Sequence, residues 1–217
     1  MFSKNALTSL ELQSLEEIKE FQNQKLQEQI KYLATHSKFY QDLFKKYQID
    51  WKSIQTTEDL KLIPVTTKND LQQYNFDFLC VPLTEIIDYS TTSGTLGDPV
   101  TFGLTDKDLD RLAANEMNSF QRIGVQKGDV VQLMTTIDRR FMAGLAYFLG
   151  LRKIGAGVIR VGAGVPQLQW DSILKYQPKF LVAVPSFLLK MLDYAEKNNI
   201  DYQNSSVKSV LCIGESL

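Results

Sequence analysis

This 217-residue sequence has only two cysteines and a single histidine. Cys80 and Cys212 lie far apart and neither belongs to a Cys-x-x-Cys pair, which argues against a disulfide framework and a cysteine-based metal site. Both are expected to be buried as small hydrophobes. His36 has no obvious nucleophile or base beside it in sequence, so a structural role is expected.

The sequence also lacks a charge excess and a long apolar run. Lys and Arg number 24 against 25 Asp and Glu, so neither nucleic acid nor an acidic membrane surface is expected as a partner. No apolar run approaches the ~18 residues of a membrane span, and the first residues lack the apolar core of a signal peptide. We therefore expect a cytosolic protein without a membrane partner. With 44% hydrophobic residues, the chain can form one large domain or a domain with an appendage.

Residues 1–80 are predicted to form a helical N-terminal cap. Thr8 and Glu11 have the spacing of a capping box, and apolar residues follow at near-helical intervals, which predicts a long amphipathic helix over residues 9–34. Ser37 is the expected N-cap of a second helix with an aromatic face, over residues 38–47.

Two further capping boxes predict two further helix starts. Thr67 with Asp70 marks the first, and Thr105 with Asp108 marks the second. Lys68 would lie in the first turn of the earlier helix, where the helix dipole opposes a cation. Lys68 is therefore either simply solvated or held near an anion.

From residue 129 onward the sequence alternates between short β-branched runs and helical patterns. This alternation predicts an α/β fold, with a mainly parallel sheet and flanking helices, over residues 81–217. Ligands bind such sheets beyond the carboxyl ends of the strands, where this sequence carries small and polar residues. The expected strands are 129–134, 157–161, 180–184 and 207–213, and the expected helices are 140–154, 166–176 and 186–198.

The stretch from Ser90 to Pro99 combines five hydroxyl side chains with two glycines. Glycines let a backbone come close to a ligand, and hydroxyls add neutral hydrogen-bond donors for phosphate oxygens. The Walker pattern is excluded because it requires a lysine and a helix directly after the loop, whereas extended runs lie on both sides here. The stretch is therefore either a hairpin connection or a glycine-rich phosphate loop between two strands.

Six stretches follow one another in a recognisable order and spacing, from about residue 30 to the end. They are Ser37–Tyr40, Leu62–Leu71, Thr92–Pro99, Leu149–Ile159, Val184–Leu189 and Ile213–Leu217. In that order they resemble the segments S-P-F-Y-R, L-P-x-T-x-K-x-D-L, S-S-G-T-T-G-x-P, Y-G-A-E-x-L-G-x-x-V-I, T-P-S-Y-x-L and G-A-E-P. These segments are typical of the phenylacetate-CoA ligase group of the adenylate-forming enzymes. The resemblance implies the N-terminal part of the adenylate-forming fold.

The resemblance implies a two-step reaction that uses ATP, Mg²⁺ and coenzyme A. A carboxylate attacks the α-phosphate of ATP, which gives an acyl-adenylate and pyrophosphate, and the thiol of coenzyme A then displaces AMP. Hydrogen-bond donors, a cation and Mg²⁺ would stabilise the charge of the transition state. The phosphate-binding residues that the resemblance implies are Thr92, Ser93, Gly94, Thr95 and Gly97. It also implies that Lys68 contacts a phosphate, which is the second of the two interpretations of Lys68 given above.

The resemblance also implies positions for the adenosine and for the acyl group. Gly214, Glu215 and Ser216 would lie against the adenine and ribose. The implied acyl-pocket residues are Phe141, Met142, Ala143, Gly144 and Tyr147. Packing in an ordinary helix core is the alternative for these residues, although the small pair Ala143 and Gly144 beside Phe141 suits an apolar ligand wall.

The sequence departs from the pattern of the group at a few positions. Leu96 removes one hydroxyl donor from the loop, and Asp98 puts a negative charge beside the expected phosphate site. Arg139 and Arg140 stand where the group has small and apolar residues. If their guanidiniums face the pocket, the acid would be larger than phenylacetate or carry a second anionic group.

The later motifs of the group, including its adenylation lysine and C-terminal lid domain, have no counterpart before Leu217. We therefore expect an N-terminal fragment that is inactive by itself. Its expected partners are a small carboxylic acid, ATP and coenzyme A, with a homodimer left open. One alternative is an acyl-protein synthetase, which passes a fatty acyl group to a protein thiol. Another is a nucleotide-binding module without turnover.

Overall fold

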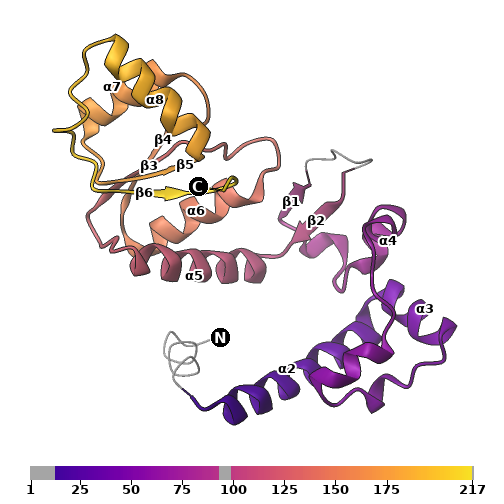
Figure 1. Ribbon diagram of the computed structural model, residues 1–217. Coiled ribbons are helices and arrows are strands. Elements are labelled where there is room, and N and C mark those ends of the chain that lie inside the picture. Colours follow the sequence, from indigo (N-terminus) through magenta and orange to yellow (C-terminus); the bar gives the residue numbers. More distant parts are fainter. Residues whose placement is uncertain (1–12, 93–98, 217) are drawn as a thin grey trace. The chain divides into compact units, whose positions relative to one another are not determined.

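The computed structural model describes residues 13–92 and 99–216 of the chain (Figure 1). The described residues form two compact units. The first holds residues 13–85 with 99–100, and the second holds residues 86–92 with 101–216. No helix within the described ranges is long and apolar enough to cross a membrane.

Helices and 3₁₀ turns make up the first unit. Ser14 caps the first described helix with Glu17 as the partner of its capping box, so this helix begins at Leu15, and the predicted start near residue 9 lies outside the described residues. The predicted pair Thr8 and Glu11 lies outside the described residues. The helices are α2 (Leu15–His36), α3 (Lys38–Lys46) and α4 (Lys68–Gln73), with the 3₁₀ turns η1 (Trp51–Ser53), η2 (Thr57–Leu62), η3 (Asn75–Phe78) and η4 (Leu83–Glu85).

The aromatic face of α3 forms the core of the first unit. The ring of Phe39 stacks on that of Phe78 with centroids 3.9 Å apart, and Phe44 is buried. Ser37 caps α3 by accepting from the amide of Tyr40, and its buried hydroxyl donates to a backbone carbonyl at Asp77. The prediction of an aromatic helix capped at Ser37 is therefore confirmed.

The second unit begins with a hairpin and continues as a parallel sheet. Strands β1 (Asp88–Thr91) and β2 (Thr101–Leu104) pair antiparallel, on either side of the glycine-rich stretch. The sheet has the strand order β4-β3-β5-β6, and all of its pairs are parallel. The predicted strands are confirmed as β3 (Val130–Leu133), β4 (Gly157–Arg160), β5 (Phe180–Ala183) and β6 (Ser209–Cys212).

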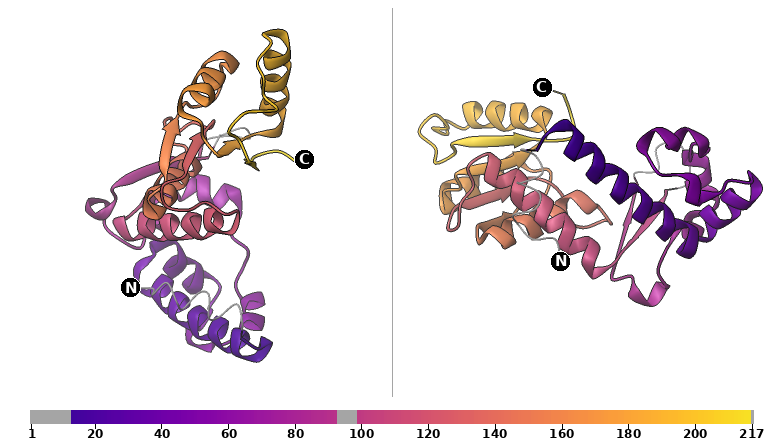
Figure 2. Two further views of the ribbon diagram at one scale, coloured as in Figure 1. Left: turned by 90° about the vertical axis from the view of Figure 1, so that its left-hand side faces the viewer. Right: turned by 90° about the horizontal axis from the view of Figure 1, so that it is seen from below.

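Helices cover both faces of this sheet (Figures 1 and 2). Alternate residues of each strand point to opposite faces, so Val131 and Leu133 pack with Phe120 and Leu151, while Leu181 and Ala183 pack on the other side. Helices α5 (Asp106–Arg122) and α6 (Met142–Ile154) supply the first cluster. The second cluster comes mainly from α7 (Pro166–Tyr176) and α8 (Pro185–Lys197). The expected α/β fold is therefore confirmed.

Candidate functional site

The chain reverses direction across the sheet between β3 and β5. The connection through α6 leads from β3 outward to β4, and α7 then returns the chain past β3 to β5. Since crossovers are right-handed, the reversal places α6 on one face and α7 on the other. The loops that leave the carboxyl ends of β3 and β5 therefore diverge. This divergence marks the topological switch point of the sheet, and doubly wound folds bind their ligands beside that point.

The loop after β3 lies at this switch point and is held close to the first turn of α6. A Cβ atom built on Gly144 would lie 1.8 Å from the carbonyl oxygen of Thr136, so only glycine fits at this position. The hydroxyl of Thr136 donates to the carboxylate of Asp138 within the same loop. The close approach fixes residues 135–141 against α6, which gives Gly144 a packing role that the sequence did not reveal.

A turn of unusual conformation ends this loop. Phe141 donates its amide to the carbonyl of Asp138 over 3.2 Å, and the two residues between them, Arg139 and Arg140, have φ angles of +57° and +60°. The amide of Thr91, at the end of β1, donates to the carbonyl of Arg140 over 3.0 Å. The turn is therefore tied to the strand that leads into the glycine-rich stretch.

The glycine-rich stretch itself is described only at its two ends. Ser90 is buried and its hydroxyl donates to the carboxylate of Asp88 over 3.0 Å, so this side chain has a structural role in the hairpin. Thr92 is half-buried directly after β1. Ser93, Gly94, Thr95 and Gly97, which the sequence predicts to bind phosphate, lie outside the described residues, as do Leu96 and Asp98.

The predicted adenosine-binding residues follow β6 and contact the beginning of α8. Glu215 accepts from the backbone amide of Ser186 over 2.9 Å and from its hydroxyl over 2.7 Å. These hydrogen bonds, the amide first and the hydroxyl second, hold the pKa of the Glu215 carboxyl below its ordinary value. Gly214 has a φ of +74°, which lets the chain turn back toward β5. Sequence reasoning missed the Ser186 contact, because its partner lies 29 residues away.

The predicted acyl-pocket residues lie at the beginning of α6. Phe141 is the N-cap residue and, like Met142, exposes more than a third of its surface, whereas Ala143 is half-buried. Tyr147 packs edge-to-face on the core residue Phe120, with ring centroids 6.0 Å apart. Burial, followed by the nearby carboxylate of Glu116, raises the pKa of the Tyr147 hydroxyl. A pocket role for this set remains a prediction.

A buried pair of amides links strands β3 and β4 to helix α7. The amide nitrogen of Gln132 on β3 donates to Gln169 on α7 over 2.8 Å, and Gln169 donates to the carbonyl of Gly162 just after β4 over 2.8 Å. Both glutamines are almost wholly buried. The carboxyl ends of β3 and β4 are thus joined by hydrogen bonds that periodicity alone could not predict.

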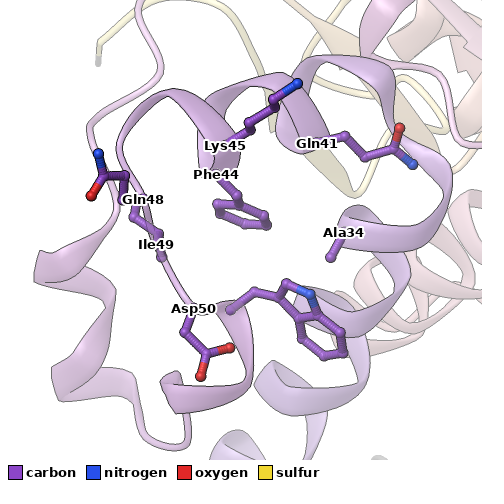
Figure 3. Close-up of a pocket in the computed structure, with 8 residues that line it drawn as sticks. Ala34, Gln41, Phe44, Lys45, Gln48, Ile49 and Asp50 are labelled. Atoms are coloured by element: carbon purple, nitrogen blue, oxygen red, sulfur yellow. The ribbon is translucent and has the colours of Figure 1, made fainter.

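Lys68, the remaining predicted phosphate contact, lies in the first unit as the first residue of α4. Its neighbours Thr67 and Asp70 form the predicted capping box. The same unit has an open hollow of about 380 Å³, lined in part by Phe44 and Trp51 with Lys45 at its rim (Figure 3). None of the predicted site residues lines this hollow.

Within residues 13–92 and 99–216, no three His, Cys, Asp or Glu side chains are grouped closely enough to hold a metal ion. Cys80 and Cys212 are both free thiols, and burial raises the pKa of Cys80.

No protein-family model matches the sequence. Phenylacetate-coenzyme A ligase of Escherichia coli (strain K12) is 27% identical over 91% of this chain and 45% of its own length. The ligase of the same description from Aromatoleum evansii is 28% identical over 95% of this chain and 47% of its own length. The chain therefore spans about half the length of the curated relatives that it matches.

A crystal structure of 2-hydroxyisobutyryl-CoA ligase, in complex with 2-HIB-AMP and CoA, superimposes with a TM-score of 0.84. It is 23% identical in sequence, and the match covers 93% of this chain and 44% of that one. This likeness concerns the fold alone. The chain is thus homologous to phenylacetate-CoA ligases over about 45% of their length, and it has the fold of the N-terminal half of a CoA ligase.

Proposed function

We propose that this chain is the nucleotide- and acyl-binding part of an ATP-dependent carboxylate–CoA ligase. The observation that carries the proposal is the homology of the chain to phenylacetate-CoA ligases. The matching part includes a parallel sheet whose switch point, between β3 and β5, lies beside the hairpin β1–β2. ATP, a small carboxylic acid and coenzyme A would be its ligands, and a cytosolic location would supply all three.

In the proposed reaction, a carboxylate oxygen attacks the α-phosphorus of ATP and pyrophosphate leaves. The sulfur of coenzyme A then attacks the acyl carbon, AMP leaves, and the thiol proton passes to water. Thr92 and the loop after it would donate hydrogen bonds to the pyrophosphate, because its charge grows as the bond to the α-phosphorus breaks. Lys68 is kept as a predicted phosphate contact because of its place in the matching segment Leu62–Leu71.

The turn Gly214–Ser216 would lie against the adenosine, since it stands at the carboxyl end of β6. Glu215 would hold the turn in place through its two hydrogen bonds from Ser186. Each of its carboxylate oxygens keeps a lone pair that could accept from the adenosine. The acyl group would lie at the beginning of α6, where Phe141 and Met142 expose apolar surface.

The test is acid-dependent exchange of labelled pyrophosphate into ATP. It would be run on the 217-residue chain and on any longer form that its gene encodes, with aryl, fatty and dicarboxylic acids supplied in turn. Exchange with one class of acid, followed by formation of a CoA thioester, is the expected result. The double variant Ser93→Ala, Thr95→Ala should lose ATP binding with an unchanged melting temperature in the absence of ligand.

Two outcomes would change the proposal. Exchange followed by acyl transfer to a protein thiol, without dependence on coenzyme A, would identify an acyl-protein synthetase. ATP binding without exchange in either form would identify a nucleotide-binding module that lacks turnover. Unchanged ATP affinity in the double variant would refute the assignment of the glycine-rich stretch as the phosphate loop.

A further inference from the structure

The turn Asp138–Phe141 places two arginines where a turn ordinarily has glycine or asparagine. Positive φ angles at both central positions are the pattern of a type I′ turn, which strongly prefers Asn-Gly because other side chains crowd the backbone. Arg139 and Arg140 both adopt this conformation. A bulky residue held at positive φ is a local conflict between sequence and backbone, and such conflicts concentrate at functional sites.

Neighbouring hydrogen bonds hold the turn in this conformation. The amide of Phe141 closes it on the carbonyl of Asp138, and the amide of Thr91 binds the carbonyl of Arg140 from the end of β1. Gly144 packs directly on the preceding residues of the loop. The backbone is therefore anchored on three sides at the carboxyl end of β3, and the two side chains extend from a fixed base.

The two guanidiniums are largely unneutralised. Arg139 is 87% exposed, and its Nε lies 4.0 Å from a carboxylate oxygen of Asp138, which makes a weak surface pair. Among the residues that the structure describes, no carboxylate lies within 4.0 Å of Arg140. Two adjacent cations thus stand in the loop that leaves the carboxyl end of β3, with capacity to bind an anion.

Apolar surface lies beside these charges. Phe141 is the last residue of the turn and Met142 follows it, and these residues are 40% and 37% exposed. A ligand that satisfied both features would have a hydrocarbon or aromatic body and a negatively charged end. Guanidinium groups suit a carboxylate at that end, because their planar N–H donors match its two oxygens.

We propose that Arg139 and Arg140 select an acid with a second anionic group, namely a dicarboxylic acid with an apolar spacer or ring. One carboxylate would bind the arginines while the other reacts at the α-phosphate. This inference rests on the proposed ligase function for the reacting carboxylate, but the anion site at the turn exists independently of turnover. Arg139 and Arg140 would then stand at positions where Asn and Gly are less strained, because their charges bind the substrate.

The first experiment measures binding to the 217-residue chain at low salt by following backbone amide NMR signals. Adipate is titrated against its neutral diamide, up to about 10 mM. We expect adipate to shift the signals of Asp138–Met142 and to bind about tenfold more tightly than the diamide. The double variant Arg139→Asn, Arg140→Gly should lose this preference while keeping or raising its melting temperature, since Asn-Gly suits the turn. The control Arg152→Gln removes a cation from the last turn of α6, away from the turn Asp138–Phe141, and should keep the preference for adipate.

Equal binding of adipate and its diamide, or a preference that survives in the double variant, would overturn the inference. Tripolyphosphate is the second probe. If the double variant loses tripolyphosphate binding and the chain never prefers adipate, the arginines bind nucleotide phosphate and the substrate assignment is wrong.

The second experiment compares adipate with hexanoate in pyrophosphate exchange by the longest encoded form. Faster exchange with adipate, lost in the double variant, is expected, whereas faster exchange with hexanoate would overturn the substrate class. If exchange fails with every acid while the binding preference holds, the proposed ligase function fails and the anion site at the turn stands.

Discussion

The close approach at Gly144 makes a strong prediction about the stability of the second unit. Replacing Gly144 by alanine would put a methyl carbon 1.8 Å from the carbonyl oxygen of Thr136, and side-chain carbons essentially never approach backbone atoms more closely than 3.0 Å. The loop after β3 and helix α6 must therefore separate by roughly 1 Å or more, against a densely packed core. Overpacking of this kind costs about 2–3 kcal/mol.

A matched control is available at Gly157, at the start of β4. A methyl group there would meet Val130 at 3.5 Å, which is an ordinary van der Waals contact. Gly157→Ala should therefore change the free energy of unfolding by less than about 0.5 kcal/mol. The two variants make the same chemical change in the same unit, so the difference between them isolates the close approach at Gly144.

The assay is urea unfolding followed by tryptophan fluorescence. The chain has two tryptophans, Trp51 in the first unit and Trp170, buried between α7 and the sheet, in the second. A Trp51→Phe background leaves Trp170 as the only indole, so the signal reports the second unit. With a slope of about 1.5 kcal/mol per molar urea, Gly144→Ala should lower the midpoint by roughly 1.3–2 M. Midpoints for the two alanine variants within about 0.3 M of each other would refute the reasoning.

Three further predictions concern polar contacts of the second unit. Asp129→Asn should lower the melting temperature by several degrees. The reason is that the Asp129 carboxylate accepts from the ammonium of Lys179 over 2.6 Å and from the amide of Gln126 over 2.9 Å. A melting curve no different from that of the wild type would contradict this prediction. Gln169→Leu should cost about 1–3 kcal/mol, since it removes partners from the amide of Gln132 and the carbonyl of Gly162, and urea unfolding would measure it. The Glu215 carboxyl has a pKa below its ordinary value of 4.5, so its contact with Ser186 should persist above pH 4.5 and be lost as the pH falls through the lowered pKa. The NMR shift of the Ser186 amide against pH would follow that loss, and Glu215→Gln should abolish the titration.

Local sequence signals predicted the elements of the fold well. The capping boxes at Thr67 and Thr105 mark the first residues of α4 and α5, because a cap depends only on residues three positions apart. Pro166 and Tyr176 bound α7 as expected. A sequence can also hold more than one such signal, since the described helix α2 is capped by Ser14 with Glu17, a pair that sequence reasoning missed.

The candidate site was less predictable because it depends on contacts between distant segments. Small and polar residues at the strand ends indicated where a site should lie, but the strand order that creates the switch point is a property of the whole sheet. No local rule predicts a turn of two arginines at positive φ, since their propensities disfavour it. The contact between Glu215 and Ser186 likewise requires β5 and β6 to be neighbours.

The outer edge of β6 has a consequence for the behaviour of the isolated chain. Among the described strands, β6 pairs only with β5, so the backbone donors and acceptors of its other side have no strand opposite them. Val210, on the same strand, is 38% exposed. An uncovered edge with an apolar side chain is a template for another strand. In concentrated solution the chain should therefore tend to assemble by extending its own sheet, and a charged substitution such as Val210→Lys should keep it dispersed.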